Sequence, residues 1–374
     1  MKFIKALAAV VATAALAMGG VTASSAATKT LTLAVLADVK SFDTAASEYG
    51  NRNLFYQTIY DGLLAADPNG KLLPSLATKW TYNSAQTVLT LNLRTDVKFT
   101  DGTKLDAAAV VKSLNAFKNG TSPDKSNVSL MKSAVAKDSS TVVITLTKSD
   151  PAFLNYLARN AGLISSPKVV GTAKAKTSPV GSGPYVLNKL KTKVGSVYTF
   201  TKNTNYWNKS AQKFDTVVLK FIEDATATVN ALKARQVNGA NLANNDVITE
   251  LMNANVQFVT STLDWVGLSF VDRSGNLKSV IKDKAVRQAI NYALDRKALL
   301  KSIGAGYGVT TTQVFAPKSA GYNSALNSSY TYNVAKAKQI LADAGYKDGV
   351  TISMPSFTFF LGDAPFTLIA DQLK

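Results

Sequence analysis

Residues 58–117 read TIYDGLLAADPNGKLLPSLATKWTYNSAQTVLTLNLRTDVKFTDGTKLDAAAVVKSLNAF, and this stretch decides the fold. It predicts a turn at Tyr60-Asp61-Gly62 and a reverse turn at Asp67-Pro68-Asn69-Gly70, since Gly, Pro, Asn and Asp favour turns. Leucines at positions 89, 91 and 93 alternate with threonine and asparagine, so one face of a strand is apolar and the other meets water. The stretch therefore predicts turns followed by two strands.

A helix should follow these strands. An Asp101-Gly102 turn precedes Asp106, whose side chain is placed to cap a helix N-terminus. The apolar residues after it recur at helical spacing and form one stripe: Ala107, Val110, Leu114 and Phe117.

Similar patterns predict elements along the rest of the chain. Strands are expected at 30–36, 141–147, 217–222 and 256–259, with another that starts at Pro184. Helices are expected at 224–236, after Asp283, between Asp295 and Gly304, and from Asn333 to Gly345. A segment rich in Gly, Thr, Lys and Ser, 171–178, is expected to be a linker.

The pairing of these strands should be mixed. Strands followed by helices near Val217 and Gly349 suggest parallel crossovers, whereas the pair around Lys98 suggests a hairpin. The sequence therefore predicts an α/β protein.

The N-terminal residues 1–26 are typical of a secretory signal peptide. Lys2 and Lys5 precede an uncharged run at 6–18, and small residues follow at Ser24-Ser25-Ala26. The apolar run is shorter than the roughly 20 residues that a membrane span needs. The sequence is 46% hydrophobic, enough to supply cores for two or three domains.

The sequence contains neither histidine nor cysteine. Ser-His-Asp and Cys-His nucleophiles, and zinc sites built on His or Cys, are therefore excluded for these residues, as is lipid attachment through a cysteine. Ser165-Ser166-Pro167-Lys168 has the S-x-x-K spacing of Ser-Lys hydrolases, but the same spacing recurs elsewhere without the partner motifs. We expect no enzyme activity, metal or cofactor, and keep a secreted hydrolase as the alternative from another class.

The net charge is +18, which could attract nucleic acid, a membrane or an acidic ligand. No Lys/Arg-rich run typical of a nucleic-acid patch is present. We interpret the charge as a solvated basic surface and expect no nucleic-acid partner.

Several segments together resemble one family. They are the order of elements in 58–117, Gly181-Ser182-Gly183-Pro184-Tyr185, Asn203-Thr204-Asn205-Tyr206-Trp207, and Lys284-Ala285-Val286-Arg287-Gln288-Ala289-Ile290 with Asp295-Arg296. The chain is similar to the family 5 extracellular solute-binding proteins, the peptide and nickel receptors of bacterial ABC importers.

This resemblance implies a two-lobed, periplasmic-binding-protein-like α/β fold with mixed sheets and an inserted subdomain. Residues 27–59 and 180–263 would form the central subdomain of the first lobe, and 60–179 the inserted one. Residues 264–374 would begin the second lobe, which we expect to be incomplete because family members continue past Lys374.

The implied function is capture of a peptide between the lobes and its delivery to an ABC permease in the inner membrane. The protein would be a periplasmic monomer without a lipid-anchor cysteine. An oligosaccharide is the alternative ligand, and nickel is less favoured because histidine is absent.

Candidate ligand-binding residues follow from their expected position at the cleft. They are Ser47, Tyr49 and Asn51 in one loop, Ser182 in the glycine turn, and Trp265 at the crossing into the second lobe. Trp265 could equally serve as core packing, whereas Tyr206 and Trp207 are favoured as core anchors.

Overall fold

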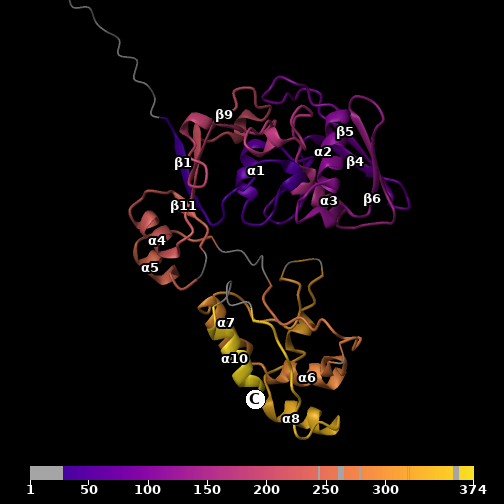
Figure 1. Ribbon diagram of the computed structural model, residues 1–374, viewed down its shortest axis with the longest axis vertical. Coiled ribbons are helices and arrows are strands. Elements are labelled where there is room, and N and C mark those ends of the chain that lie inside the picture. The colour runs from indigo at the N-terminus through magenta and orange to yellow at the C-terminus, as the bar shows by residue number, and fades with distance from the viewer. Residues whose placement is uncertain are drawn as a thin grey trace, which may run out of the picture.

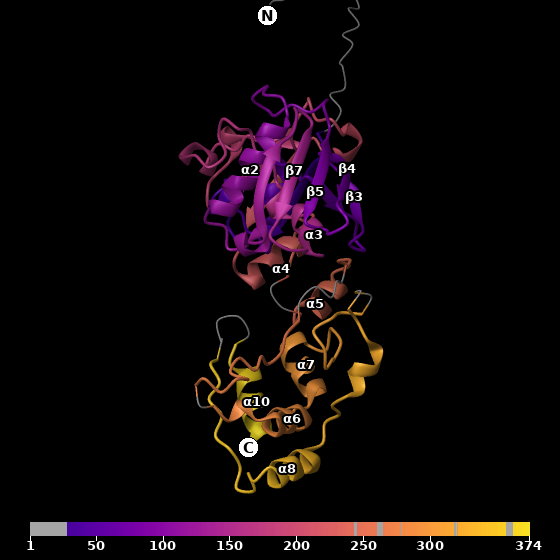
Figure 2. The same cartoon turned by 90° about the vertical axis from the view of Figure 1, so that its right-hand side faces the viewer.

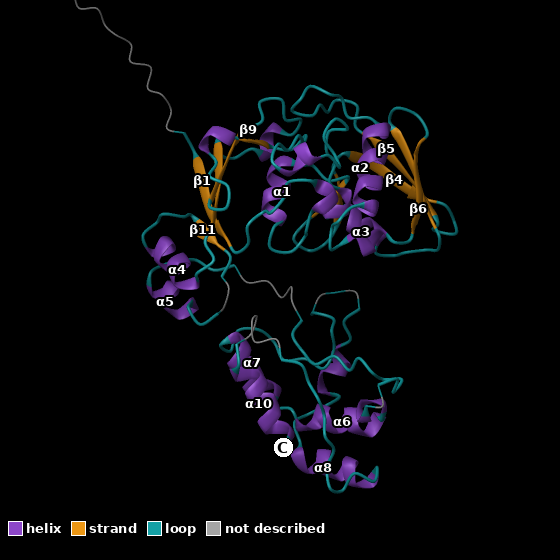
Figure 3. Cartoon of the chain, viewed as in Figure 1, coloured by secondary structure: helices purple, strands orange, loops and turns teal. Residues whose placement is uncertain are grey.

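A computed structural model describes residues 28–242, 245–259, 265–277, 279–317, 319, 321–356 and 362–374. The described residues up to 259 form a first body, and those from 265 onward form a second body (Figures 1 and 2). Every strand of the described residues lies in the first body (Figure 3). The expected signal peptide, 1–26, lies outside the described residues. None of the helices in the described ranges is long and apolar enough to cross a membrane.

One sheet of the first body has the strand order β11-β1-β10-β9-β8. Its strands are β1 (Thr30–Val35), β8 (Tyr185–Leu187), β9 (Val197–Lys202), β10 (Thr216–Phe221) and β11 (Gly239–Ala240). β1 pairs in parallel with β10 and β11, whereas β9 pairs antiparallel with β10 and β8. Helix α4 (Ala225–Lys233) carries the chain from β10 to β11, so the crossover expected near Val217 is confirmed and the sheet is mixed.

Helix α1 (Asn53–Ile59) packs against this sheet. Phe55 and Tyr198 are buried, and their ring centroids lie 5.1 Å apart in an edge-to-face contact. Such pairs add to the stabilisation that comes from area burial alone. These aromatic contacts therefore hold α1 on the sheet.

The other sheet is antiparallel, with the order β4-β5-β7-β6. Its strands are β4 (Ala77–Tyr82), β5 (Val88–Leu93), β6 (Met131–Ala136) and β7 (Thr141–Leu146). A short hairpin of β2 (Leu64–Ala66) and β3 (Leu72–Pro74) precedes it. Leu89 and Leu91 are fully buried, which confirms the predicted apolar face of β5.

Helices α2 (Ala107–Asn119) and α3 (Phe153–Leu157) pack on this sheet. Asp106 caps α2, because its Oδ1 accepts a hydrogen bond from Ala109 N at 2.8 Å, as predicted. All four residues of the predicted apolar stripe are buried. The predicted reverse turn also forms, since Gly70 N donates to Asp67 O at 2.9 Å.

The second body contains α6 (Lys284–Ala293), α7 (Arg296–Gly304), α8 (Val334–Asp343) and α10 (Ala364–Leu373). Asp283 and Asp295 cap α6 and α7 through backbone N–H groups, as predicted. Val286 and Ile290 on α6 are buried together with Ile369 on α10. These helices therefore share one small core.

Two predicted elements are wrong. Residues 256–259 form a loop, because Val256 N donates to Leu251 O at the end of α5 (Ile248–Asn253), where a neighbouring strand would be needed. The strand expected after Gly349 is also absent from 350–356, since the described part of the second body offers it no strand to pair with.

Two further segments differ from expectation. Tyr60-Asp61-Gly62 is extended and makes no turn, because Gly62 pairs with Leu163 and Ile164 N donates to the Asp61 carbonyl at 3.1 Å. The expected linker 171–178 contains a short 3₁₀ helix (Ala173–Lys176), and Phe42 N donates to the Lys176 carbonyl at 3.1 Å. The division into a central and an inserted subdomain stays a prediction.

Candidate functional site

The glycine turn Gly181-Ser182-Gly183 lies directly against the end of α1. Gly183 N donates to the Ile59 carbonyl oxygen at 2.8 Å. A Cβ atom added at Gly181 would lie 2.1 Å from the same oxygen, and one at Gly183 would lie 2.6 Å from it. Only glycine fits such a close backbone approach, which explains the residue choice at both positions.

Asp61, which follows α1, is a buried carboxylate with three donors. Ser182 Oγ donates to its Oδ2 at 2.8 Å, Trp207 Nε1 donates to the same oxygen at 3.0 Å, and Tyr206 Oη donates to Oδ1 at 3.0 Å. The Arg94 guanidinium stacks on the Trp207 ring at 4.1 Å from its centroid. Burial nevertheless raises the pKa of Asp61 above its ordinary value, because desolvation outweighs the hydrogen bonds and the Arg94 charge.

This cluster connects the two sheets, because Ser182 precedes β8 of the mixed sheet and Arg94 follows β5 of the antiparallel sheet. Ser182 is 1% exposed, and its hydroxyl is bonded to Asp61. Tyr206 is buried as well, and Trp207 is partly buried, which agrees with their interpretation as core anchors. Contact of Ser182 with a ligand stays a prediction.

Ser47 and Tyr49 lie in the loop that precedes α1, and this loop is tied to distant segments. The Ser47 carbonyl accepts hydrogen bonds from Ser122 Oγ at 2.5 Å and from Asn160 Nδ2 at 3.0 Å. Asp124 Oδ2 accepts from Tyr49 N and from Asn160 Nδ2, both at 2.8 Å. The structure therefore brings Ser47 and Tyr49 together around Asp124 and Asn160.

Asn160 is 1% exposed, yet its Oδ1 has no hydrogen-bond partner among the described residues. Buried polar atoms are nearly always paired, so such an atom suggests a missing partner. Thr44 Oγ1, in the segment before α1 that also carries Ser47, is likewise buried without a partner in the described part of the chain. Thr44 and Asn160 thus retain unused hydrogen-bonding capacity around Ser47.

Arg159 adds an exposed charge to this group. Its guanidinium lies 4.8 Å from the centroid of the Tyr49 ring, at cation–π distance. Within the described residues it makes no ion pair. Arg159 closely follows α3, which lies on the side of the first body that faces the second in both views (Figures 1 and 2). An exposed guanidinium that has no ion-pair partner among the described residues can bind a carboxylate.

The other two predicted residues form no hydrogen bond with this group in the described part of the chain. Asn51 is exposed in the turn before α1. Trp265 is 44% exposed, and its ring lies against the backbone of Gly267, where an added Cβ atom would come within 2.3 Å of it. Contact of these five residues with a ligand stays a prediction.

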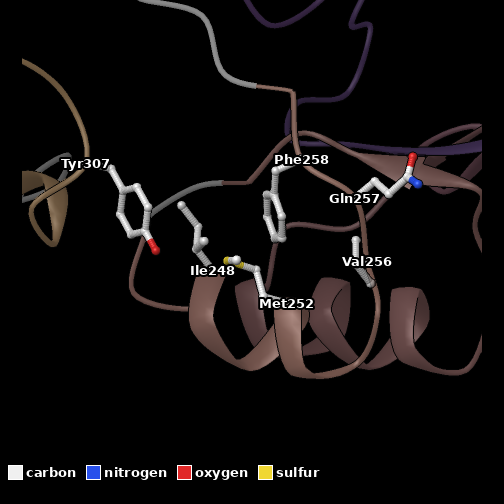
Figure 4. A pocket seen from close by; sticks show the side chains of 6 residues that line it. All are labelled: Ile248, Met252, Val256, Gln257, Phe258 and Tyr307. Atoms are coloured by element: carbon white, nitrogen blue, oxygen red, sulfur yellow. The ribbon is translucent and has the colours of Figure 1, made fainter.

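An open cavity of about 470 Å³ lies between the two bodies. It is lined by Ile248 and Met252 from α5, by Val256, Gln257 and Phe258 from the following loop, and by Tyr307 after α7 (Figure 4). Met252 is 57% exposed and Tyr307 is 41% exposed, so apolar surface is available to a ligand. Close by, Asn245 Nδ2 donates to the Gly304 carbonyl at 3.2 Å and links the bodies.

Comparison with known proteins gives the class to which this fold belongs. The family model described as bacterial extracellular solute-binding proteins, family 5 Middle, matches residues 71–373. The chain belongs to this family, so the resemblance found in the sequence is confirmed.

Among curated relatives, the chain is 30% identical over 308 residues to the glutathione-binding protein GsiB of Salmonella paratyphi A. The match covers 80% of this chain and 58% of that relative. The chain thus spans less than two thirds of the length of the curated relatives that it matches most strongly.

Solved structures confirm the fold. NikZ from Campylobacter jejuni, in complex with Ni(L-His), is 26% identical at a TM-score of 0.65, over 84% of this chain and 63% of that one. DppA from Helicobacter pylori, in complex with the peptide STSA, is 23% identical at a TM-score of 0.68, over 91% of this chain and 72% of that one. The expected two-lobed α/β binding-protein architecture is therefore confirmed.

Sequence reasoning missed the groups formed by long-range contacts. Asp124, Arg159 and Asn160 carry no motif, and Tyr307 lies in a loop without a recognisable pattern. The sequence signal that could have pointed to this group is the polar pair Arg159-Asn160, which closely follows the apolar helix α3. No group of three or more Asp or Glu side chains in the described ranges is arranged to hold a metal ion.

Proposed function

We propose that this protein is the substrate-binding component of an ABC importer, which captures a peptide between its two bodies and delivers it to a membrane permease. The observation that carries this proposal is the position of the open cavity, lined by α5 on one side and by Tyr307 on the other. A ligand that contacts both sides stabilises the closed arrangement through its differential affinity. The permease can then recognise the closed form.

Two separate places on the side of the first body that faces the second suit different groups of a peptide, since α3 and α5 lie at opposite ends of that body (Figure 1). The exposed Arg159 guanidinium, held on the Tyr49 ring, would bind a carboxylate through charge-assisted hydrogen bonds. The cavity beside α5 would take an apolar side chain, because Ile248, Met252 and Phe258 are among the residues that line it. A relative at 30% identity is named a glutathione-binding protein, and glutathione is a tripeptide.

A peptide is favoured over the oligosaccharide alternative. A sugar needs many hydrogen-bonding groups for its hydroxyls, whereas the described residues that line the cavity offer only the Gln257 amide and the Tyr307 hydroxyl as polar side-chain groups. The relatives named above are binding proteins, which favours binding over the hydrolase alternative. The serine that this hydrolase would use as its nucleophile is also buried. Ser165 is 1% exposed, and its Oγ donates to the Val180 carbonyl at 3.2 Å.

The proposal also places the protein outside the cytoplasm, in agreement with a family described as extracellular. We propose export by the signal peptide 1–26 and action as a periplasmic monomer that has no lipid anchor. The permease partner follows from the importer function.

Arg159→Gln tests the carboxylate contact. Isothermal titration with a tripeptide that has a free C-terminal carboxylate should show a loss of roughly tenfold or more in affinity, the range of hydrogen bonds to charged groups. For the C-terminally amidated tripeptide, which has no terminal carboxylate, this variant and the unchanged protein should have about the same affinity. Arg235→Gln, an exposed site after α4 with the same change in charge, is the control. Equal losses in both variants would contradict the contact.

A further inference from the structure

The loop that joins β8 to β9 is a well-defined projection from the first body. It begins with a short 3₁₀ helix (Lys189–Lys191), whose Lys191 N donates to the Asn188 side chain at 3.1 Å. It closes where Lys193 N donates to the Val197 carbonyl at 2.7 Å, with Gly195 in the left-handed region at φ +79°. These bonds give the loop one defined shape.

Its apolar side chains point into solvent. Leu190 is 100% exposed and Val194 is 77% exposed. Single exposed apolar residues are common, but two on one short loop, alternating with charges, form a distinct surface. Nothing in the described residues covers either side chain.

Lysines surround these two side chains. Lys189, Lys191 and Lys193 lie on the loop and are all exposed. Lys189 Nζ donates to Ser178 Oγ, which brings the loop beside the exposed Lys174 and Lys176. None of these five lysines forms an ion pair within the described residues.

The surrounding sequence reinforces this positive charge. Between Asp150 and Asp215 the chain has no acidic residue, although it has one arginine and nine lysines there. This block thus contributes +10 of the net charge of +18. More than half of the net positive charge therefore lies in this part of the chain.

We propose that this basic loop docks the protein on an anionic phospholipid surface, with Leu190 and Val194 entering the headgroup region. The lysines would bind headgroup phosphates, since clustered basic residues are attracted to anionic leaflets. Apolar side chains between them suit the boundary between headgroups and acyl chains. The loop has no aromatic side chain on which a base could stack, which argues against nucleic acid.

Docking would keep the protein near membrane-embedded partners without any covalent anchor. It would not depend on which ligand the interbody cavity binds, so this inference is separate from the proposed function. An acidic protein surface is the competing partner for the same lysines, and vesicles that contain no protein distinguish the two.

Co-sedimentation with lipid vesicles tests the proposal on the full chain. Binding is expected to vesicles that contain phosphatidylglycerol, to be weak on phosphatidylcholine alone, and to fall as salt is raised. Each lysine near an anionic surface contributes roughly a fivefold factor in partitioning, so the double variant Lys191→Gln, Lys193→Gln should lose about 25-fold. Leu190→Ser should lose about tenfold at unchanged charge.

The matched control is the double variant Lys132→Gln, Lys137→Gln. It makes the same change in net charge at and just beyond β6, which lies at the opposite end of the first body from β9 (Figure 1). It should bind vesicles nearly as well as the unchanged protein. Absence of vesicle binding, or equal losses in both double variants, would overturn the proposal, and the first result would point to an acidic protein partner.

Discussion

The two bodies of this protein cover their apolar surfaces to different extents. In the first body, side chains such as Leu89, Leu91 and Phe153 are 0% exposed, because each sheet has helices packed against it. In the second body, Val309, Val314 and Phe315 are 55%, 60% and 51% exposed. Helices with aspartate caps occur in both bodies, such as α2 in the first and α6 and α7 in the second. Local helix signals are thus present in both bodies, and what differs is tertiary packing.

The largest effect is expected where two backbone segments of the first body touch. Gly181→Ala should destabilise the protein by about 4 kcal/mol or more, because a Cβ atom there would lie 2.1 Å from the Ile59 oxygen. Gly195→Ala, in open space at φ +79°, should cost only about 1 kcal/mol. Urea denaturation of both variants measures the difference, and similar midpoints would contradict this account of the glycine turn.

The next largest difference between the two bodies is expected when an apolar side chain is truncated. Leu91→Ala should lower the free energy of unfolding by about 3 kcal/mol, because it leaves a cavity in a fully packed core. Val309→Ala should change it by less than about 0.5 kcal/mol, because Val309 is 55% exposed. Thermal unfolding followed by circular dichroism checks both values. A large loss for Val309→Ala would mean that its surface is covered in solution.

Helix caps should behave alike in both bodies. Asp106→Ala at α2 and Asp295→Ala at α7 should each cost about 1 kcal/mol, since each carboxylate satisfies N–H groups at the start of its own helix. Denaturation monitored by signals from each body gives the two values. A much larger cost at one cap would show that its aspartate has a role beyond the helix.

The smallest effect concerns pH. Burial raises the pKa of Asp61 in the folded protein, so the folded state binds this proton more tightly than the unfolded state does. The stabilisation linked to this proton is complete below the ordinary aspartate pKa of 3.8 and is lost as pH rises through the higher folded pKa. Relative to Asp61→Asn, the unchanged protein should therefore lose stability with rising pH in this window. Parallel stability curves for the two proteins would contradict the raised pKa.

Elements that depend on local pattern were predictable from the sequence. The alternation of Leu89, Leu91 and Leu93 gave the buried face of β5, and Asp106, Asp283 and Asp295 cap the helices that they were expected to cap. Each of these features involves residues close together in the chain, so periodicity and capping chemistry suffice.

Features that depend on distant segments were not predictable. Asn160 contacts Ser47 across 113 positions, and the sequence gives no sign of that contact. The apolar pattern at 256–259 predicted a strand, but a strand also needs a partner, and Val256 instead bonds to the end of α5. The same reason explains why Arg159 and Tyr307 were missed as candidate ligand contacts.

The central claim, capture of peptides between the two bodies, is tested most directly by native mass spectrometry. The protein should be expressed from its full reading frame and purified without refolding, so that ligand bound in the cell is retained. The account predicts a spread of bound masses that fragment as peptides. A single bound species that fragments in steps of one hexose would contradict it and favour the oligosaccharide alternative.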